Sequence, residues 1–153
     1  LRFFTVYGPY GRPDMAYFKF TEAIISGAPI DVYNNGDMKR DFTYIDDIIE
    51  GVIRVINNIP ESKPNRYSNS APPYAIYNIG NNTPITLTSF IKAIEDACGR
   101  CAIKNLLPMQ AGDVPVTFAD VDSLVEDVKF KPETNISEGM ERFVQWYRQW
   151  HRP

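Results

Sequence analysis

Segments rich in β-forming residues alternate with amphipathic segments, and this alternation limits the fold of this chain more than any other feature. Residues 1–7 are apolar and β-rich, as expected of a buried parallel strand. A loop rich in glycine and proline follows at 8–13, and a helical pattern comes next. Such alternation predicts an α/β fold. The opening strand has no partner nearby in the sequence, so we expect it to belong to a sheet built partly by residues outside this chain.

Capping residues and apolar stripes predict five helices. Asp14, Thr86 and Asn135 are the expected N-cap residues of the first, third and last helices, because their side-chain oxygens can accept hydrogen bonds from the first amides. In the second helix we expect one stripe to face the core, formed by Ile49, Val52, Ile53 and Ile56. The expected helices are 14–26, Asp46 or Asp47 to just before Pro60, 87–98, 122–128 and 136–150.

Short β-rich runs between these helices predict further strands. The Asn34–Asp37 segment is a strong turn signal between two of them. Residues 61–73 are polar and rich in proline and serine, which predicts a surface loop. The expected strands are 30–34, 38–45, 75–79, 102–107 and 116–119.

Charge and composition exclude several classes of protein. The net charge is −3, so no basic field invites nucleic acid. No apolar run is long enough to predict a membrane span. Cys98 and Cys101 follow a helical pattern and the one histidine is His151, so we expect ordinary reduced thiols, no metal site and a cytoplasmic protein. The chain begins without an initiator Met or a leader pattern, and we expect it to be part of a longer protein.

The loop after the opening strand resembles a dinucleotide-binding turn only superficially. Pro9 and Pro13 remove amide donors that such a turn needs, and Asp14 would repel a pyrophosphate. A different anion site fits this loop better than a dinucleotide-binding turn does. Arg12 lies in a stiff loop and Thr5 lies in the opening strand, so the two side chains could converge on one anionic group. The alternative is a solvated arginine beside an ordinary strand threonine.

Three further residues could contact a ligand, and each has a structural alternative. Arg40 lies in an aromatic segment, where a cation needs an anion; the alternative is a salt bridge to Asp41 or Asp46. Tyr33 precedes a turn and could stack on a base or belong to the core. Asp113 lies in a turn and could accept hydrogen bonds from ribose hydroxyls or cap its own backbone.

Some catalytic motifs are missing from the sequence. No tyrosine is followed four positions later by lysine, and no complete glycine fingerprint is present. We therefore expect no catalytic residue within these 153 residues.

Six segments of the sequence carry motifs that occur together in one known family. These segments are 1–9, 12–16, 40–42, 45–47, 77–80 and 112–114. Taken in order, they are similar to those of the extended short-chain dehydrogenase/reductases, the NAD-dependent epimerase/dehydratase family. The likeness is greatest to the UDP-glucuronate 4-epimerases and related capsular polysaccharide biosynthesis proteins. Gln110 stands where galactose-type epimerases have an arginine, which weakens a UDP-galactose assignment.

The resemblance implies a fold, a cofactor and residue roles. The chain would be the carboxyl-terminal substrate-binding portion, residues 1–153, carrying the last strands and helices of the Rossmann-like sheet. A preceding part, absent here, would hold NAD and the catalytic tyrosine and lysine. By resemblance, Phe3 lies near the nicotinamide; Thr5 and Arg12 hold the uronate; Val32 and Tyr33 line the uracil pocket; Arg40 binds the pyrophosphate and Asp113 the ribose.

The implied activity is an NAD-dependent isomerisation. UDP-glucuronate and UDP-galacturonate would interconvert through a 4-keto intermediate, in a full-length enzyme that is a homodimer. Two alternatives remain open at this point. One is a UDP-glucuronate decarboxylase or sugar-nucleotide dehydratase of the same fold, and the other is a sugar-nucleotide-binding module without catalysis.

Overall fold

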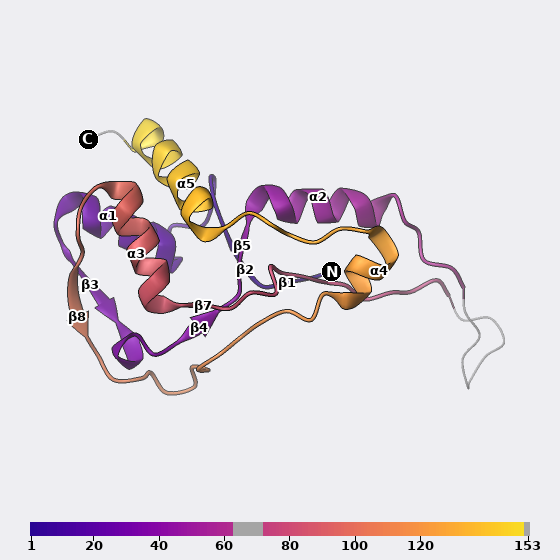
Figure 1. Ribbon diagram of the computed structural model, residues 1–153, viewed down its shortest axis with the longest axis horizontal. Helices are drawn as coiled ribbons and strands as arrows, with labels where there is room; N and C mark the ends of the chain where they lie inside the picture. The colour runs from indigo at the N-terminus through magenta and orange to yellow at the C-terminus, as the bar shows by residue number, and fades with distance from the viewer. Residues whose placement is uncertain (63–71, 152–153) are drawn as a thin grey trace.

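Strands and helices alternate through the chain as the sequence predicts, and the α/β class is confirmed (Figure 1). The computed structural model describes residues 1–62 and 72–151. The elements are β1 (Arg2–Phe3), β2 (Thr5–Tyr7), α1 (Ala16–Ser26), β3 (Pro29–Val32), the 3₁₀ turn η1 (Tyr33–Gly36), β4 (Lys39–Arg40), β5 (Phe42–Tyr44), α2 (Ile45–Ile56), β6 (Asn78–Ile79), β7 (Ile85–Thr86), α3 (Leu87–Cys98), β8 (Ile103–Leu106), α4 (Asp122–Val128) and α5 (Ile136–Trp150).

The opening strand is split between two partners from later in the chain. β1 pairs in parallel with β6, and β2 pairs in parallel with β5. The change of partner occurs at Phe4 and Thr5, because the Phe4 amide donates to Ile79 and the Thr5 amide to Asp41. The strand therefore finds neighbours within this chain, and the prediction of one continuous buried strand is wrong: Arg2 and Phe3 are exposed.

Two more strand pairs complete the sheet structure of the described residues. β3 pairs in parallel with β8, and β4 pairs antiparallel with β7. The segment predicted as a strand at 116–119 makes only an isolated bridge, from Val116 to Lys39. The two backbone hydrogen bonds of this bridge both involve Lys39 and no other residue of β4. Of the predicted loop at 61–73, residues 63–71 lie outside the described part of the chain.

A buried carboxylate fills the interruption between β4 and β5. Asp41 is fully buried and accepts hydrogen bonds from the amides of Asn81 at 2.9 Å, Asn82 at 3.0 Å and Ala119 at 2.8 Å. A buried carboxylate is tolerated when amides replace its water. Asp41 thus joins three separate segments beneath the strands that carry Thr5 and Arg40.

Two apolar clusters form the core. The larger one lies where α1, α3 and α5 pack against β2 and β5, and it includes Phe42 stacked on Phe90 with ring centroids 4.0 Å apart. Figure 1 shows these three helices grouped together, away from α4. The smaller cluster lies between α2 and α4 and includes Ile48, Ile79 and Leu124.

Two of the three predicted helix caps are confirmed. The Thr86 hydroxyl accepts from the Ser89 amide at 3.1 Å, and the Asn135 side chain accepts from the Glu138 amide at 2.9 Å. Asp14 does not cap α1. Met15 is the N-cap residue, and its side chain makes no capping hydrogen bond. The Asp14 carboxylate is bound by Arg12 instead.

The apolar stripe predicted on the second helix contacts the core only at Val52, which packs against the smaller cluster. α2 begins at Ile45, so Asp46 and Asp47 lie in its first turn, where they complement the helix dipole. Its buried face carries Ile48 and Gly51. The side chains of Ile49, Ile53 and Ile56 are instead 49%, 47% and 68% exposed.

Candidate functional site

Three adjoining hollows form one elongated groove beside β2, β3 and α1. The first hollow has a volume of about 610 Å³ and includes Thr5 and Met15 in its lining. The second, of about 350 Å³, shares those two residues. The third, of about 450 Å³, shares Phe20 and Tyr33 with the second. An extended ligand could therefore contact all three hollows.

The loop 8–13 places Arg12 in the lining of the first hollow, which also includes Phe3 and Thr5 from the opening strands. Gly11 is required in this loop, because a Cβ there would lie 1.6 Å from the Tyr17 hydroxyl oxygen. The Met15 amide donates to the Arg12 carbonyl at 3.2 Å and fixes the backbone of the loop. The sequence-predicted pair Thr5 and Arg12 thus lines one hollow.

The Arg12 side chain is held by an acid from its own loop. Its Nε donates to Asp14 Oδ1 at 3.0 Å and its Nη2 donates to Asp14 Oδ2, which is a bidentate arrangement. The hydrogen bond from Arg12 lowers the pKa of the Asp14 carboxyl. Both side chains are largely exposed, so the pair is an accessible one.

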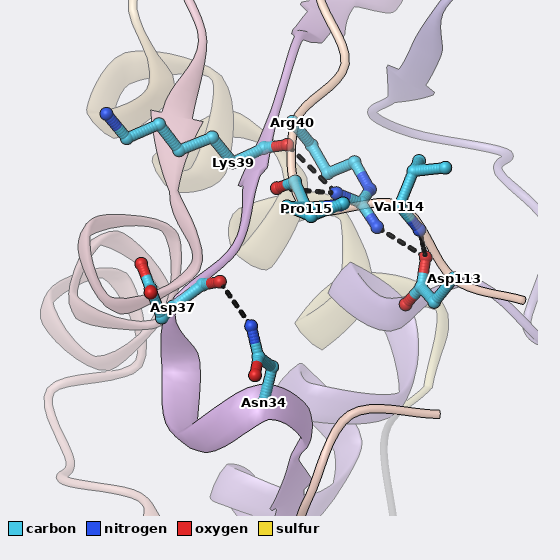
Figure 2. Close-up of polar contacts among 7 residues, drawn as sticks. All are labelled: Asn34, Asp37, Lys39, Arg40, Asp113, Val114 and Pro115. Atoms are coloured by element: carbon cyan, nitrogen blue, oxygen red, sulfur yellow. Dashed lines mark hydrogen bonds and ion pairs between the residues drawn. The ribbon is translucent and has the colours of Figure 1, made fainter. Parts of the chain in front are cut away.

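Arg40 and Asp113 meet in the second hollow (Figure 2). Arg40 Nη2 donates to Asp113 Oδ1 at 2.6 Å, and Arg40 Nη1 donates to the carbonyls of Lys39 at 2.9 Å and Pro115 at 3.3 Å. Asp113 Oδ1 also accepts from the Val114 amide at 2.8 Å, as its turn-capping alternative predicts. The cation therefore lies in a fixed position on the groove wall.

The alternative partners predicted for Arg40 are wrong. Asp41 is turned inward and its carboxylate is used by three backbone amides. Asp46 lies 3.6 Å from Arg142. The residue that does pair with Arg40 comes from a segment far along the chain.

Backbone hydrogen bonds explain how that distant segment reaches Arg40. The Lys39 amide donates to the Pro115 carbonyl at 2.8 Å, and the Thr117 amide donates to the Lys39 carbonyl at 3.2 Å. Gly112 takes a φ of +84°, which allows the tight turn before Asp113. Segment 112–117 is thereby attached along β4.

Tyr33 lines the groove, but its neighbour Val32 belongs to the core. Tyr33 is half-buried and lines the second and third hollows. Val32 is only 2% exposed and belongs to the larger core cluster, and it lines none of the three hollows. Asn34 Nδ2 donates to the Asp37 carbonyl at 2.7 Å and holds the turn that follows Tyr33 (Figure 2).

The groove also includes residues that the sequence does not single out as site residues, among them Met15, Phe20 and Asp31. Asp31 could have been found, because it alternates with buried Ile30 and Val32 along β3 and must point to the other side. It accepts a hydrogen bond from Asn105 at 2.8 Å. Met15 and Phe20 carry no sequence signal that separates them from core residues.

The groove can bind a ligand that carries anions at two separate points. Arg12 serves the first hollow and Arg40 the second, while Tyr33 offers an aromatic surface and Asp31 and Asp113 offer acceptors for hydroxyl groups. Within residues 1–62 and 72–151, no group of three or more potential ligands is arranged to hold a metal ion. The same residues include no helix that is long and apolar enough to cross a membrane.

Comparison with known proteins identifies the family. A model of the NAD dependent epimerase/dehydratase family matches residues 1–80, which is just over half of the chain. The chain belongs to this family. Protein CapI of Staphylococcus aureus is 52% identical over 99% of the chain, and a probable UDP-glucuronate 4-epimerase of Rhizobium meliloti is 49% identical over 99%.

A solved epimerase of the family supports the fold. The UDP-glucuronic acid 4-epimerase of Bacillus cereus, in complex with UDP-glucuronic acid and NAD, is 31% identical over 97% of this chain, with a TM-score of 0.82. The fold is therefore that of the extended short-chain dehydrogenase/reductase epimerases. The chain spans about half the length of the relatives it matches: 47% of CapI and 44% of the Bacillus cereus enzyme.

Proposed function

We propose that residues 1–153 form the carboxyl-terminal, UDP-sugar-binding portion of an NAD-dependent UDP-glucuronate 4-epimerase. The observation that carries this proposal is the likeness, over 97% of the chain, to an epimerase solved with UDP-glucuronic acid and NAD. The remaining half of the protein, which precedes this portion in our proposal, supplies the NAD-binding Rossmann part and the catalytic tyrosine and lysine.

The groove suggests how the ligand would lie. The uronate would occupy the first hollow, where Thr5 can donate a hydrogen bond and the guanidinium of Arg12 can bind a carboxylate in bidentate fashion. The diphosphate would lie at Arg40, and Asp113 would accept from the ribose hydroxyls. The uracil would then lie beside Tyr33, with the backbone of Val32 behind it.

The first hollow also suits the nicotinamide of NAD. Phe3 is half exposed there, in the same hollow as Thr5, so its ring can cover one face of an aromatic group. When bound, NAD would supply reversible hydride transfer at C4 of the sugar, with the hydroxyl proton taken up and returned by the catalytic tyrosine of the other half. The residues of this chain would hold the sugar against it and exclude water from one side of the hollow.

Arg12 would also protect the substrate from a side reaction. Oxidation at C4 turns the uronate into a β-keto acid, which loses carbon dioxide easily. A guanidinium that holds the carboxylate in a fixed orientation would oppose that loss. Isomerisation without decarboxylation is thus the activity that we expect.

The test is a product analysis with the whole protein and NAD. UDP-glucuronate should be converted to UDP-galacturonate until the two reach equilibrium, with no net consumption of NAD. Release of carbon dioxide, or formation of a dehydrated sugar, would instead identify a decarboxylase or a dehydratase. Binding of UDP-glucuronate without any conversion would identify a non-catalytic module.

Light scattering of the same sample tests the homodimer, which should have twice the mass of one chain.

A further inference from the structure

Each of the two candidate ligand cations already has a carboxylate partner within the chain. Arg40 binds Asp113, and Arg12 binds Asp14. The second pair matters most, because Asp14 uses the Nε and Nη2 edge of Arg12, which is one of the edges that a ligand carboxylate would use. Asp14 therefore occupies an edge of Arg12 that the uronate carboxylate of the proposed substrate could use.

The charges along the groove are balanced before any ligand arrives. Arg12, Lys19 and Arg40 line the hollows, and so do three carboxylates, those of Asp14, Asp31 and Asp113. A uronic-acid sugar nucleotide carries about three negative charges, two on its diphosphate and one on its carboxylate. Arg12 can make its full bidentate contact with such a ligand along the Nε and Nη2 edge only if Asp14 leaves that edge.

We propose that Asp14 is a specificity-determining residue whose carboxylate occupies Arg12 in the empty groove and is exchanged for the carboxylate of the ligand. The inference rests on the proposed function, because it takes a uronic-acid sugar nucleotide as the ligand. Asp14 thereby sets the margin by which the groove prefers a charged sugar over a neutral one.

The structure makes this exchange easy. The side chains of Arg12 and Asp14 are 75% and 58% exposed, and exposed ion pairs are weak. The loop backbone has a hydrogen bond that is independent of the pair, from the Met15 amide to the Arg12 carbonyl at 3.2 Å. The Arg12 guanidinium can therefore change partners without refolding the loop.

The released Asp14 carboxylate also has a second place to bind. α1 begins at Ala16 behind Met15, which provides no side-chain acceptor for the first amides of the helix. A carboxylate at the start of a helix is stabilised by those amides and by the helix dipole. Asp14 would leave Arg12 for the helix end, so the exchange costs less than the loss of an ion pair alone.

The test compares two ligands that differ in one carboxylate, UDP-glucuronate and UDP-glucose. Both are titrated calorimetrically into the whole protein with NAD bound. We expect Asp14→Asn and Asp14→Ser to lower the Kd for UDP-glucuronate by about two- to fivefold, the strength of an exposed ion pair, and to leave the Kd for UDP-glucose unchanged. Both replacements remove the charge and keep a short polar side chain at position 14.

Two controls separate this exchange from a general change in charge. Asp31→Asn removes a carboxylate from the same groove that is bonded to Asn105 and not to Arg12, so it should change both affinities by the same factor. In an Arg12→Gln background, Asp14→Asn should no longer alter the preference.

The outcomes distinguish the inference from the proposed function. An unchanged or reduced preference in both Asp14 variants, in a protein whose wild type prefers UDP-glucuronate, overturns the inference alone. A wild-type protein that binds neither ligand, or prefers UDP-glucose, overturns the proposed function and the inference with it.

Discussion

Arg40 is the side chain on which the polar contacts of the second hollow converge. It donates to two carbonyls and one carboxylate, so its guanidinium is oriented before any ligand binds. We expect Arg40→Gln in the whole protein to weaken UDP binding by about ten- to a hundredfold, since hydrogen bonds to charged groups contribute about 1.5–3 kcal/mol. Calorimetric titration with UDP measures this change.

Arg54→Gln provides the matched control for Arg40. Arg54, on α2, pairs with Glu50 of the same helix and donates to the carbonyl of Lys129, the residue after α4. It lines none of the three hollows. The Arg54→Gln variant should leave the affinity for UDP unaltered. Equal losses in the two variants would remove Arg40 from the ligand site.

Glu95 is a buried carboxylate whose ionisation should be measurable through the stability of the protein. Burial alone would raise the pKa of its carboxyl, but the hydrogen bonds from Lys104 and from the Ala102 amide outweigh burial and lower it. A carboxyl with a lowered folded-state pKa contributes stability above its unfolded-state pKa. That contribution is lost as the pH falls through the folded-state value.

We therefore expect Glu95→Gln to lower the free energy of unfolding by about 1–2 kcal/mol at neutral pH and by less near pH 3. Urea unfolding followed by circular dichroism at both pH values measures the difference. Asp96→Asn is the control, because Asp96 is exposed beside Lys92 and should change stability little. A loss for Glu95→Gln that does not depend on pH would contradict this assignment.

At the scale of elements, α3 offers a direct test of local capping. The Thr86 hydroxyl satisfies the Ser89 amide at the start of this helix. Thr86→Ala should lower the free energy of unfolding by about 0.5–2 kcal/mol, whereas Thr86→Ser, which keeps the oxygen, should restore most of it. Thermal unfolding of the two variants side by side gives the result. Similar values for both would mean that the lost methyl group, and not the cap, stabilises α3.

Elements that depend on neighbouring residues were predictable from the sequence. Thr86 and Asn135 lie a few residues from the amides they bind, so local pattern suffices for α3 and α5. Asp14 was predicted wrongly as a cap because Arg12, two positions away, competes for the same carboxylate. Local pattern identifies the available partners but not which one is chosen.

Features that depend on distant residues were not predictable. Periodicity groups Ile49 and Ile53 on one apolar stripe, but the position of β6 and α4 decides that Ile48 faces the core instead. In the candidate site, the contact of Arg40 with Asp113 depends on the attachment of segment 112–117 to β4. Arg40 and Asp113 could be named as candidate site residues from the sequence, but their pairing could not.

At the scale of the whole molecule, the exposed apolar side of α2 should govern association. Ile49, Ile53 and Ile56 are exposed on one helix, and contiguous apolar surfaces of this kind promote binding to other surfaces. The relatives are about twice as long as this chain, and we expect their additional residues to cover this side. The 153-residue chain alone should therefore self-associate with rising concentration.

Replacing Ile49 and Ile53 together by lysine should reduce that association, because the two charges interrupt the apolar surface. Sedimentation velocity over a range of concentrations measures it. Lysine introduced at Gln145, an exposed position on α5, is the control and should leave association unchanged. If that substitution reduces association equally, net charge and not the side of α2 is responsible.

The split opening strand also has a consequence for how the molecule is made. Each of its halves pairs with residues that are synthesised much later: Thr5 with Phe42, and Arg2 with Asn78. β3 likewise waits for β8. Contacts between residues so distant along the chain form slowly, because a long loop must be closed, at a cost in entropy, before the strand hydrogen bonds can form. On the ribosome, β1 would therefore remain without β6, and β3 without β8, until those later strands have emerged, and chaperones would have long access to both.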